Sequence, residues 1–122
     1  MSGEKRKVMI VDDNIINLMI AEELLVNHGY DVVKISAPHG CVAKLDYEQP
    51  DVLLIDITMP RLPADDVIEA IRNSPDHEDL IVVLYADMEA EALEKICHAK
   101  DINGYFCKSM DVTRLPEFID RF

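Results

Sequence analysis

Five short apolar runs alternate with longer amphipathic segments along the chain, and this order constrains the fold more than any other feature. The runs predict strands at residues 8–12, 31–35, 52–55, 80–85 and 104–107. Runs of four to eight apolar residues between turn-forming residues are typical of buried strands. The third and fourth runs are apolar continuously rather than at alternate positions, which indicates burial on both faces of a parallel sheet. The sequence therefore predicts strands that helices cover on both sides.

The segments between these runs have the signals of helices, expected near residues 14–28, 38–48, 64–73, 88–100 and 112–121. Asp13 or Asn14 is suited to begin the first helix and Gly29 to end it. Two apolar sets predict a wide buried face on this helix: Ile16, Ile20 and Leu24, together with Leu18, Ala21 and Leu25. Pro116 limits the last helix to a late start or a bend.

Five strand–helix units fit an α/β fold, a doubly wound five-stranded parallel sheet with right-handed crossovers and helices on both faces. The 122 residues are about one domain's worth of chain, and no repeat, low-complexity stretch or linker divides them. We therefore expect one domain over residues 1–122.

The charge of the chain excludes several classes of partner. Its net charge of -12 weighs against direct binding to nucleic acid, which needs patches of lysine and arginine, and against an anionic membrane surface. No secretory signal or membrane span is apparent. Cys41, Cys97 and Cys107 lack metal or disulfide spacing and are expected as small buried hydrophobes in a reducing compartment, so the cytoplasm is the expected location.

Charged residues follow three of the apolar runs at the point where each run ends. Asp12 and Asp13 follow the first, Asp56 follows the third and Lys108 follows the fifth. Ligands of parallel α/β sheets bind in the crevice beyond the carboxyl ends of the strands, so these side chains are expected to meet in one pocket. Clustered carboxylates repel each other and call for a cation, and Mg²⁺ (or Mn²⁺) suits such an oxygen-rich site.

Such a pocket suits phosphoryl transfer to a carboxylate. Attack of Asp56 on phosphorus would form an aspartyl phosphate, while the metal and Lys108 neutralise charge on the equatorial oxygens. The regions of Met59 and Ala86 would supply backbone N–H groups. The alternative is that the acidic residues are only turn residues or helix caps, and for Asp13 taken alone capping is the better interpretation.

Three segments resemble the response regulator receiver domain family of two-component signalling. They are VDDN at 11–14 with Asn17, DVLLIDITMP at 51–60 and GYFCK at 104–108. The resemblance covers the whole chain in order and spacing, and the segment ending in Met59 and Pro60 is its most specific part. It implies a flavodoxin-like sheet with strand order 2-1-3-4-5.

The resemblance also implies roles for individual residues. Asp56 would be the phosphoacceptor and Lys108 would contact the phosphoryl group. Asp12 and Asp13 would hold the metal together with Asp56 and the backbone carbonyl of Thr58. The chain would then be a phosphoacceptor with at most self-catalysed transfer and slow autodephosphorylation, not a conventional enzyme.

Partners follow from the same resemblance. The phosphodonor would be a phosphohistidine on a histidine kinase or histidine phosphotransfer protein. A downstream protein target would bind the face formed by the fourth helix, fifth strand and fifth helix. A weak homodimer through the fourth and fifth helices is a further expectation.

The sequence departs from the family pattern near the expected switch. The family has Thr or Ser before Ala at the end of the fourth strand, where this chain has Tyr85 before Ala86. The ring could cover the pocket, slow hydrolysis or hold one conformation, or it could simply pack on its neighbours. Tyr105, at the position of the family's switch aromatic, could compete with it for space or pack in the core. Ser109 replaces the proline that usually follows the lysine, so a trans peptide bond is expected there.

Two other functions remain open at this point. Tyr85 and Ser109 would suit a receiver-like module that binds partners without phosphorylation. A phosphatase of the haloacid dehalogenase type also uses an aspartyl phosphate, but residues 56–58 supply only half of its motif. The four histidines, including His77, lack metal spacing and are expected at the surface or as caps, and Arg72 is expected in solvent.

Overall fold

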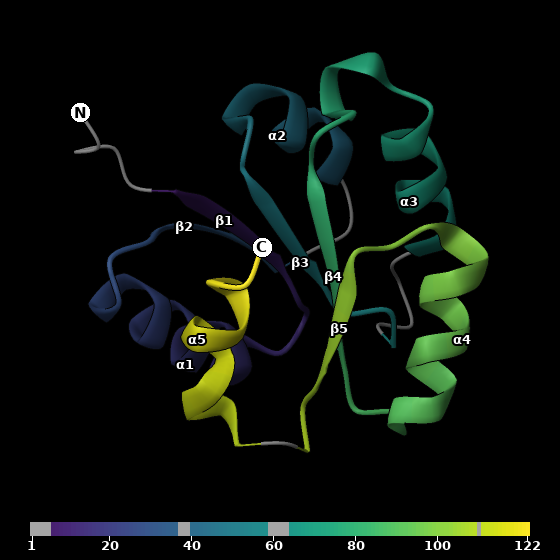
Figure 1. Cartoon of the computed structure of the whole chain (residues 1–122). Coiled ribbons are helices and arrows are strands. Elements are labelled where there is room, and N and C mark those ends of the chain that lie inside the picture. The colour runs from purple at the N-terminus through teal and green to yellow at the C-terminus, as the bar shows by residue number, and fades with distance from the viewer. Residues whose placement is uncertain (1–5, 37–39, 59–63, 110) are drawn as a thin grey trace.

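The structure is a computed structural model that describes residues 6–36, 40–58, 64–109 and 111–122, with the backbone alone at 64–66 (Figure 1). Its centre is a five-stranded sheet with the order β2-β1-β3-β4-β5. The strands are β1 (Lys7–Val11), β2 (Asp31–Ile35), β3 (Val52–Ile55), β4 (Ile81–Ala86) and β5 (Gly104–Cys107). Every neighbouring pair is parallel, so the predicted doubly wound α/β fold is confirmed.

Two strands differ by one residue from the predicted bounds because pairing with a neighbouring strand decides where a strand ends. Lys7 pairs with Asp31, so β1 begins before its apolar run and ends at Val11. Ala86 pairs with Cys107, so β4 extends past the predicted end at 85. The continuous burial predicted for the middle of the sheet is confirmed, since all four residues of β3 are buried.

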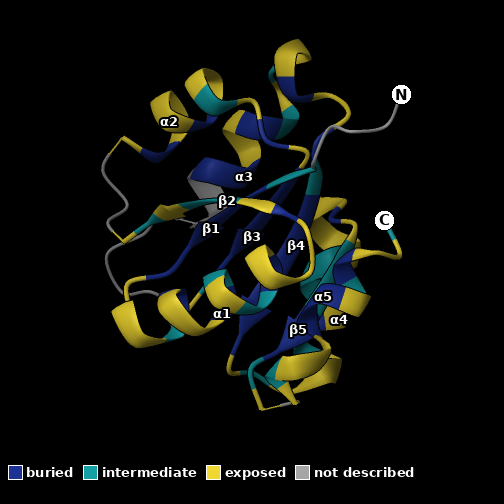
Figure 2. Cartoon of the chain, turned by 90° about the vertical axis from the view of Figure 1, so that its left-hand side faces the viewer, coloured by how far each residue is buried: buried dark blue, intermediate teal, exposed yellow. Residues whose placement is uncertain are grey.

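Helices cover the two faces of the sheet (Figures 1 and 2). One face packs on α2 (Cys41–Glu48), α3 (Ala64–Arg72) and α4 (Ala90–Lys100), and the other packs on α1 (Ile15–Asn27) and α5 (Leu115–Ile119). Each face has its own apolar cluster, built from alternate residues of the strands. No helix among the described residues is long and apolar enough to cross a membrane.

The first helix buries only one of the two apolar sets that the sequence suggests. Its N-cap is Asn14, whose side chain accepts a hydrogen bond from the backbone N–H of Asn17 at 3.0 Å, and Gly29 follows its end with a φ of 104°. Leu18, Ala21 and Leu25 are buried. The expectation for the other set is wrong, because a helix presents one stripe to a sheet.

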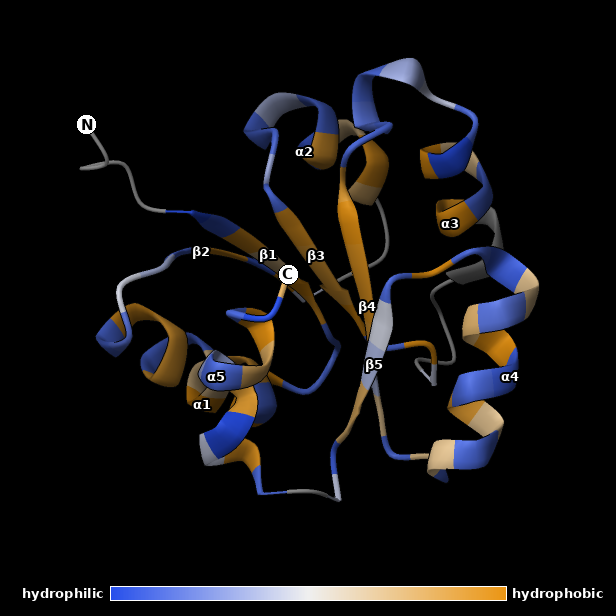
Figure 3. Cartoon of the chain, viewed as in Figure 1, coloured by the Kyte–Doolittle hydropathy of each residue, from blue (hydrophilic) through white to orange (hydrophobic). Residues whose placement is uncertain are grey.

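The outward stripe of α1 is apolar as well. Ile16 is 68% exposed and Ile20 is 42% exposed, and Ile15 and Met19 are also exposed. Figure 3 shows this helix coloured as hydrophobic over much of its length. Periodicity alone could not distinguish the two stripes, because both are apolar at helical spacing.

Two residues expected at the surface take part in tertiary contacts instead. His77 lies in a 3-10 turn, η1 (Pro75–His77), where it is buried and its Nε2 lies 2.6 Å from Oδ1 of Asp46 on α2. Arg72 donates hydrogen bonds to the carbonyl of Leu80 at 3.3 Å and to Oδ1 of Asn103 at 3.0 Å. The predictions for His77 and Arg72 are therefore wrong: polar side chains bridge segments that are distant in sequence.

The C-terminal helix is shorter than the predicted 112–121. A 3-10 turn, η2 (Val112–Arg114), precedes α5, and Pro116 lies in the first turn of α5, where its missing N–H is tolerated. Asp120, just after α5, accepts a hydrogen bond from the Tyr30 hydroxyl at 2.5 Å and lies 2.7 Å from Nε2 of His28. These contacts connect the residue after α5 to His28 and Tyr30, which follow α1.

Alkaline pH is expected to weaken this attachment. Burial, together with the hydrogen bond to Asp120, raises the pKa of Tyr30 from 10.0 to about 12. A raised pKa means that the stabilisation is complete below pH 10 and is lost as the pH rises towards 12. Urea unfolding should therefore show that wild type loses more stability over this interval than Tyr30→Phe, which lacks the ionisable hydroxyl. Parallel loss in both proteins would contradict this assignment.

Candidate functional site

The carboxyl ends of β1, β3 and β5 bring the predicted charged residues together at one edge of the sheet. Each residue continues the backbone hydrogen bonding of the sheet one step beyond its strand. The N–H of Asp12 donates to the carbonyl of Ile35 at 3.1 Å, that of Asp56 to Val11 at 2.9 Å and that of Lys108 to Ala86 at 2.9 Å. The sheet therefore sets the direction of these side chains, since the backbone that carries them is part of its ladder.

Lys108 lies between two buried carboxylates. Its Nζ is 2.7 Å from Oδ2 of Asp56 and 2.7 Å from Oδ2 of Asp12. The side chain of Asp12 is 0% exposed, that of Asp56 is 4% exposed and that of Lys108 is 14% exposed. Desolvation lowers the pKa of Lys108, but the interactions of its ammonium with the two carboxylates outweigh this effect and leave the pKa above its ordinary value. The ammonium is therefore held charged in this pocket.

The other oxygen of Asp56 accepts hydrogen bonds from Thr58, in the turn that follows β3. Oδ1 accepts hydrogen bonds from the Thr58 backbone N–H at 2.8 Å and from its hydroxyl at 2.5 Å. With Lys108 on Oδ2, both oxygens of Asp56 have partners. The carboxylate is thus less open than a phosphoacceptor expected at a pocket mouth.

Three carboxylates form the only group of potential metal ligands among the described residues. Oxygens of Asp12, Asp13 and Asp56 lie within 4.8 Å of one another. Oδ1 of Asp12 accepts from the N–H of Asn14 at 2.9 Å, whereas Oδ2 is buried without a hydrogen bond of good geometry and has the Lys108 ammonium as its neighbour. A buried carboxylate oxygen with spare capacity and an exposed Asp13 beside it fit a hard divalent cation.

Tyr85 and Tyr105 lie on opposite faces of the sheet. Tyr85 is buried in the cluster under α1 and α5, whereas Tyr105 is half-buried against the cluster under α2, α3 and α4. Leu84, not Tyr85, pairs with Tyr105, and successive residues of a strand point to opposite sides. The rings therefore do not compete for space in this structure, which corrects that expectation.

Tyr85 contacts the site itself, and although the sequence suggested that its ring could cover the pocket, the contact with Lys108 was not predicted. Its ring centroid lies 5.1 Å from Nζ of Lys108. The signal in the sequence is the aromatic residue at the end of β4, but only the alignment of β4 with β5 shows which charged group it meets. Ala86 is buried and its carbonyl accepts from Lys108, as described above. The Lys108–Ser109 bond is trans, as expected, and Met59 lies outside the described residues.

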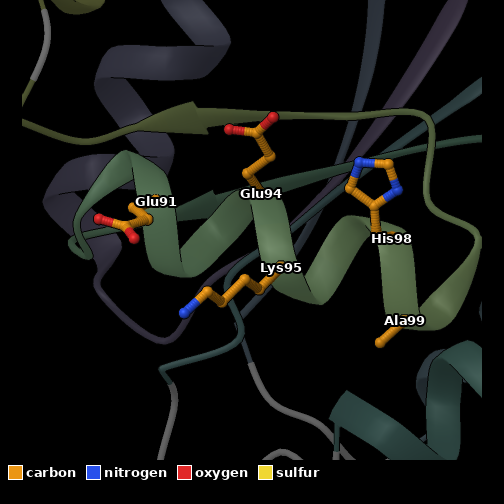
Figure 4. Close-up of a pocket in the computed structure, with 5 residues that line it drawn as sticks. All are labelled: Glu91, Glu94, Lys95, His98 and Ala99. Atoms are coloured by element: carbon orange, nitrogen blue, oxygen red, sulfur yellow. The ribbon is translucent and has the colours of Figure 1, made fainter.

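A hollow on the outer surface of α4 is unrelated to this pocket. Glu91, Glu94, Lys95, His98 and Ala99 line it. Figure 4 shows the side chains of Glu94 and Lys95 pointing to opposite sides of the helix. No converging set of ligands forms there, so Asp12, Asp13, Asp56 and Lys108 remain the candidate site.

Comparison with known proteins agrees with this geometry. The profile of the response regulator receiver domain matches residues 8–120. The chain belongs to the response regulator receiver domain family. Receiver domains are phosphoacceptors of two-component signalling rather than conventional enzymes, and the dehalogenase-type phosphatase is not the family that matches.

Individual relatives show the same module alone and inside longer proteins. Chemotaxis protein CheY of Thermotoga maritima is 29% identical over 119 residues, which cover 95% of this chain and 96% of that protein. Sensor protein GacS of Pseudomonas syringae is 33% identical over 72 residues, 59% of this chain but 8% of that protein. The chain thus corresponds to a small part of some relatives and to nearly all of others.

Solved receiver structures share the fold. CheY4 of Vibrio cholerae superposes with a TM-score of 0.86 at 20% identity, over 97% of this chain and 98% of that one. The receiver domain of sensor histidine kinase PA1611 from Pseudomonas aeruginosa, solved with a magnesium ion in its active site cleft, has a TM-score of 0.80 at 21% identity, with 97% of each chain covered. The strand order 2-1-3-4-5 is that expected for this fold.

Proposed function

We propose that this receiver domain accepts a phosphoryl group on Asp56 from a phosphohistidine of a histidine kinase or histidine phosphotransfer protein. The observation that carries the proposal is the ammonium of Lys108, 2.7 Å from Oδ2 of Asp56 and beside a group of three carboxylates. This arrangement places a nucleophilic carboxylate next to a positive charge, which stabilises phosphoryl transfer. Relatives that include histidine kinases support the donor class.

The transfer conserves atoms and charge. An oxygen of Asp56 forms a bond to phosphorus while the bond from phosphorus to the donor's imidazole nitrogen breaks, and the imidazole leaves with that electron pair. Lys108 must release Oδ2 for this attack, after which its ammonium is placed to neutralise the phosphoryl oxygens. Thr58 keeps Oδ1 fixed through its two hydrogen bonds, so the carboxylate presents its other oxygen.

A divalent cation, Mg²⁺ or Mn²⁺, fits the carboxylate group beside the nucleophile. Asp12, Asp13, Asp56 and the backbone carbonyl of Thr58 would hold it, and it would supply further positive charge for the phosphoryl oxygens. The magnesium ion in the PA1611 receiver supports this assignment. The buried Oδ2 of Asp12 supports it too, because the oxygen has no hydrogen bond of good geometry.

A downstream protein target is proposed to bind the face formed by α4, β5 and α5. A hollow of 680 Å³ lies there, lined among others by Tyr105, Phe118, Phe122, Arg114 and Arg121. Tyr105 joins this surface to the core beside the site, so a change in its packing is suited to carry the phosphoryl signal to a protein target. A weak homodimer through α4 and α5 is proposed on the same surface.

The compartment is proposed to be the cytoplasm. Cys41, Cys97 and Cys107 are all free thiols, and Cys41 and Cys107 are buried. Burial raises the pKa of the Cys41 thiol to about 11, which keeps it protonated and unreactive at neutral pH. Buried, unpaired thiols are usual in a reducing environment.

Incubation with a small-molecule phosphodonor tests the function directly. With Mg²⁺ present, intact-mass spectrometry should show the gain of one phosphoryl group, and EDTA should prevent it because the carboxylates then repel the anionic donor. Persistent failure to gain mass with Mg²⁺, also with a phosphorylated histidine protein as donor, would overturn the proposal. That result would instead favour a module that binds partners without phosphorylation.

A further inference from the structure

The ammonium of Lys108 has a third neighbour besides its two carboxylates. The Tyr85 ring lies with its centroid 5.1 Å from Nζ, within the range in which an aromatic face attracts a cation. Tyr85 and Lys108 come from the adjacent ends of β4 and β5, where Tyr85 pairs with Phe106. Two carboxylate oxygens and one ring thus surround a half-buried positive charge.

Packing fixes the ring in this place. Tyr85 is 3% exposed within the cluster that also contains Phe106 and Leu115. Its ring is tilted by 41° against that of Phe106 with 6.1 Å between centroids, and Phe106 packs edge-on against Phe118 of α5 at 5.5 Å. A side chain held by this row of rings cannot follow Lys108 if the lysine moves.

We propose that Tyr85 is a positioning residue that holds the Lys108 ammonium over the acidic pocket through the face of its ring. The attraction is stronger here than at the protein surface, because the side chain of Lys108 is only 14% exposed. Two carboxylates alone would allow the ammonium to move with either Asp12 or Asp56. The ring adds a third partner, held by its own packing, on the β4–β5 side of the site.

The consequence for phosphoryl transfer rests on the proposed function. When the lysine releases Oδ2 of Asp56, the ring keeps the ammonium at the β4–β5 side of the pocket, where it can meet the incoming phosphoryl oxygens. Pre-placed charge stabilises a transition state more than charge that must be brought into position. Tyr85 thereby acts through Lys108 and not by contact with the donor.

Proton NMR of the Lys108 side chain tests the contact without any phosphodonor. The ring current of Tyr85 should shift the ε-methylene protons of Lys108 upfield in lysine-labelled protein, and Lys108→Met identifies the signal by removing it. Tyr85→Phe should keep the shift, since it keeps the ring, and Tyr85→Leu should abolish it. An unshifted signal in wild type, or the same shift in Tyr85→Leu, would overturn the proposal.

A double-mutant cycle tests whether the contact matters for transfer. Tyr85→Leu is expected to lower the rate of phosphorylation by about fivefold, the effect of losing a cation–π contact worth about 1 kcal/mol. Tyr85→Phe should stay near the wild-type rate. In a Lys108→Met background, Tyr85→Leu should cause no further change, because the cation that the ring holds is absent. An equal fivefold loss in that background would assign Tyr85 a role independent of Lys108 and overturn the proposal.

A second set of variants tests the contact in case Tyr85→Leu fails to fold. Phenylalanine analogues with increasing ring fluorination at position 85 keep the shape of the core while they weaken the π face. The transfer rate should fall stepwise along this series, and a flat series would contradict the proposal. If wild type accepts no phosphoryl group at all, the proposed function fails, and the Lys108 shift alone then decides for or against the Tyr85 contact.

Discussion

Replacement of Asp56 by asparagine is expected to lower phosphoryl transfer to the protein on the order of 10⁶-fold, as when an enzyme loses its nucleophile. An amide oxygen is far less nucleophilic than a carboxylate oxygen, while asparagine keeps the size of the side chain. Its carbonyl can still accept the two hydrogen bonds of Thr58. The loss therefore reports chemistry rather than misfolding. Intact-mass spectrometry after incubation with a phosphodonor and Mg²⁺ measures it.

Two further variants complete this experiment. Asp87→Asn removes the same charge from an exposed residue just after β4 and should leave the mass gain intact. Asp13→Asn should slow the transfer without abolishing it, because it removes a proposed metal ligand and not the acceptor. A full mass gain in Asp56→Asn would identify another acceptor and refute the assignment of Asp56.

Replacement of Lys108 by methionine is expected to destabilise the metal-free protein by about 3 kcal/mol, the usual cost of removing one partner of a buried ion pair. Methionine nearly matches the length of lysine but leaves Asp12 and Asp56 buried without their shared cation. Urea unfolding in EDTA measures the loss. Mg²⁺ should then restore more stability to the variant than it adds to wild type, because the cation replaces the missing ammonium.

Matched substitutions separate charge compensation from simple loss of packing. Lys95→Met removes the same charge from the exposed side of α4 and should change stability little. Asp12→Asn, combined with Lys108→Met, should recover part of the loss because one unpaired charge disappears. If Lys108→Met unfolds at the same urea concentration as wild type in EDTA, the pair contributes nothing to folding.

The sequence alone predicted the sheet and the place of the charged residues because both depend on local patterns. Continuous apolar runs indicate parallel strands buried on both faces. The carboxyl ends of such strands lie at one edge, so Asp12, Asp56 and Lys108 could be placed together before any coordinates. The distances among these three residues agree with that prediction. Their chemical roles remain proposals that the experiments above test.

The tertiary structure alone decided which residues are buried where the sequence allowed more than one arrangement. Leu18 and Ile16 both belong to apolar stripes of α1, yet only the stripe of Leu18 meets the sheet. His77 is polar and does not have the spacing of a metal ligand. It is nevertheless buried, because η1 packs beside α2 and brings its ring against Asp46. Such choices depend on contacts between distant segments, about which periodicity holds no information.

The contacts among the side chains of the candidate site likewise depend on the tertiary structure. The sequence placed a tyrosine at the end of β4 and a lysine at the end of β5, 23 positions later. Only the register of β4 against β5 puts the Tyr85 ring beside the Lys108 ammonium, and only the fold closes that ammonium over Asp12 and Asp56. Local composition determined which groups stand at the edge of the sheet, whereas the pairing of strands and the packing of side chains determined which groups touch.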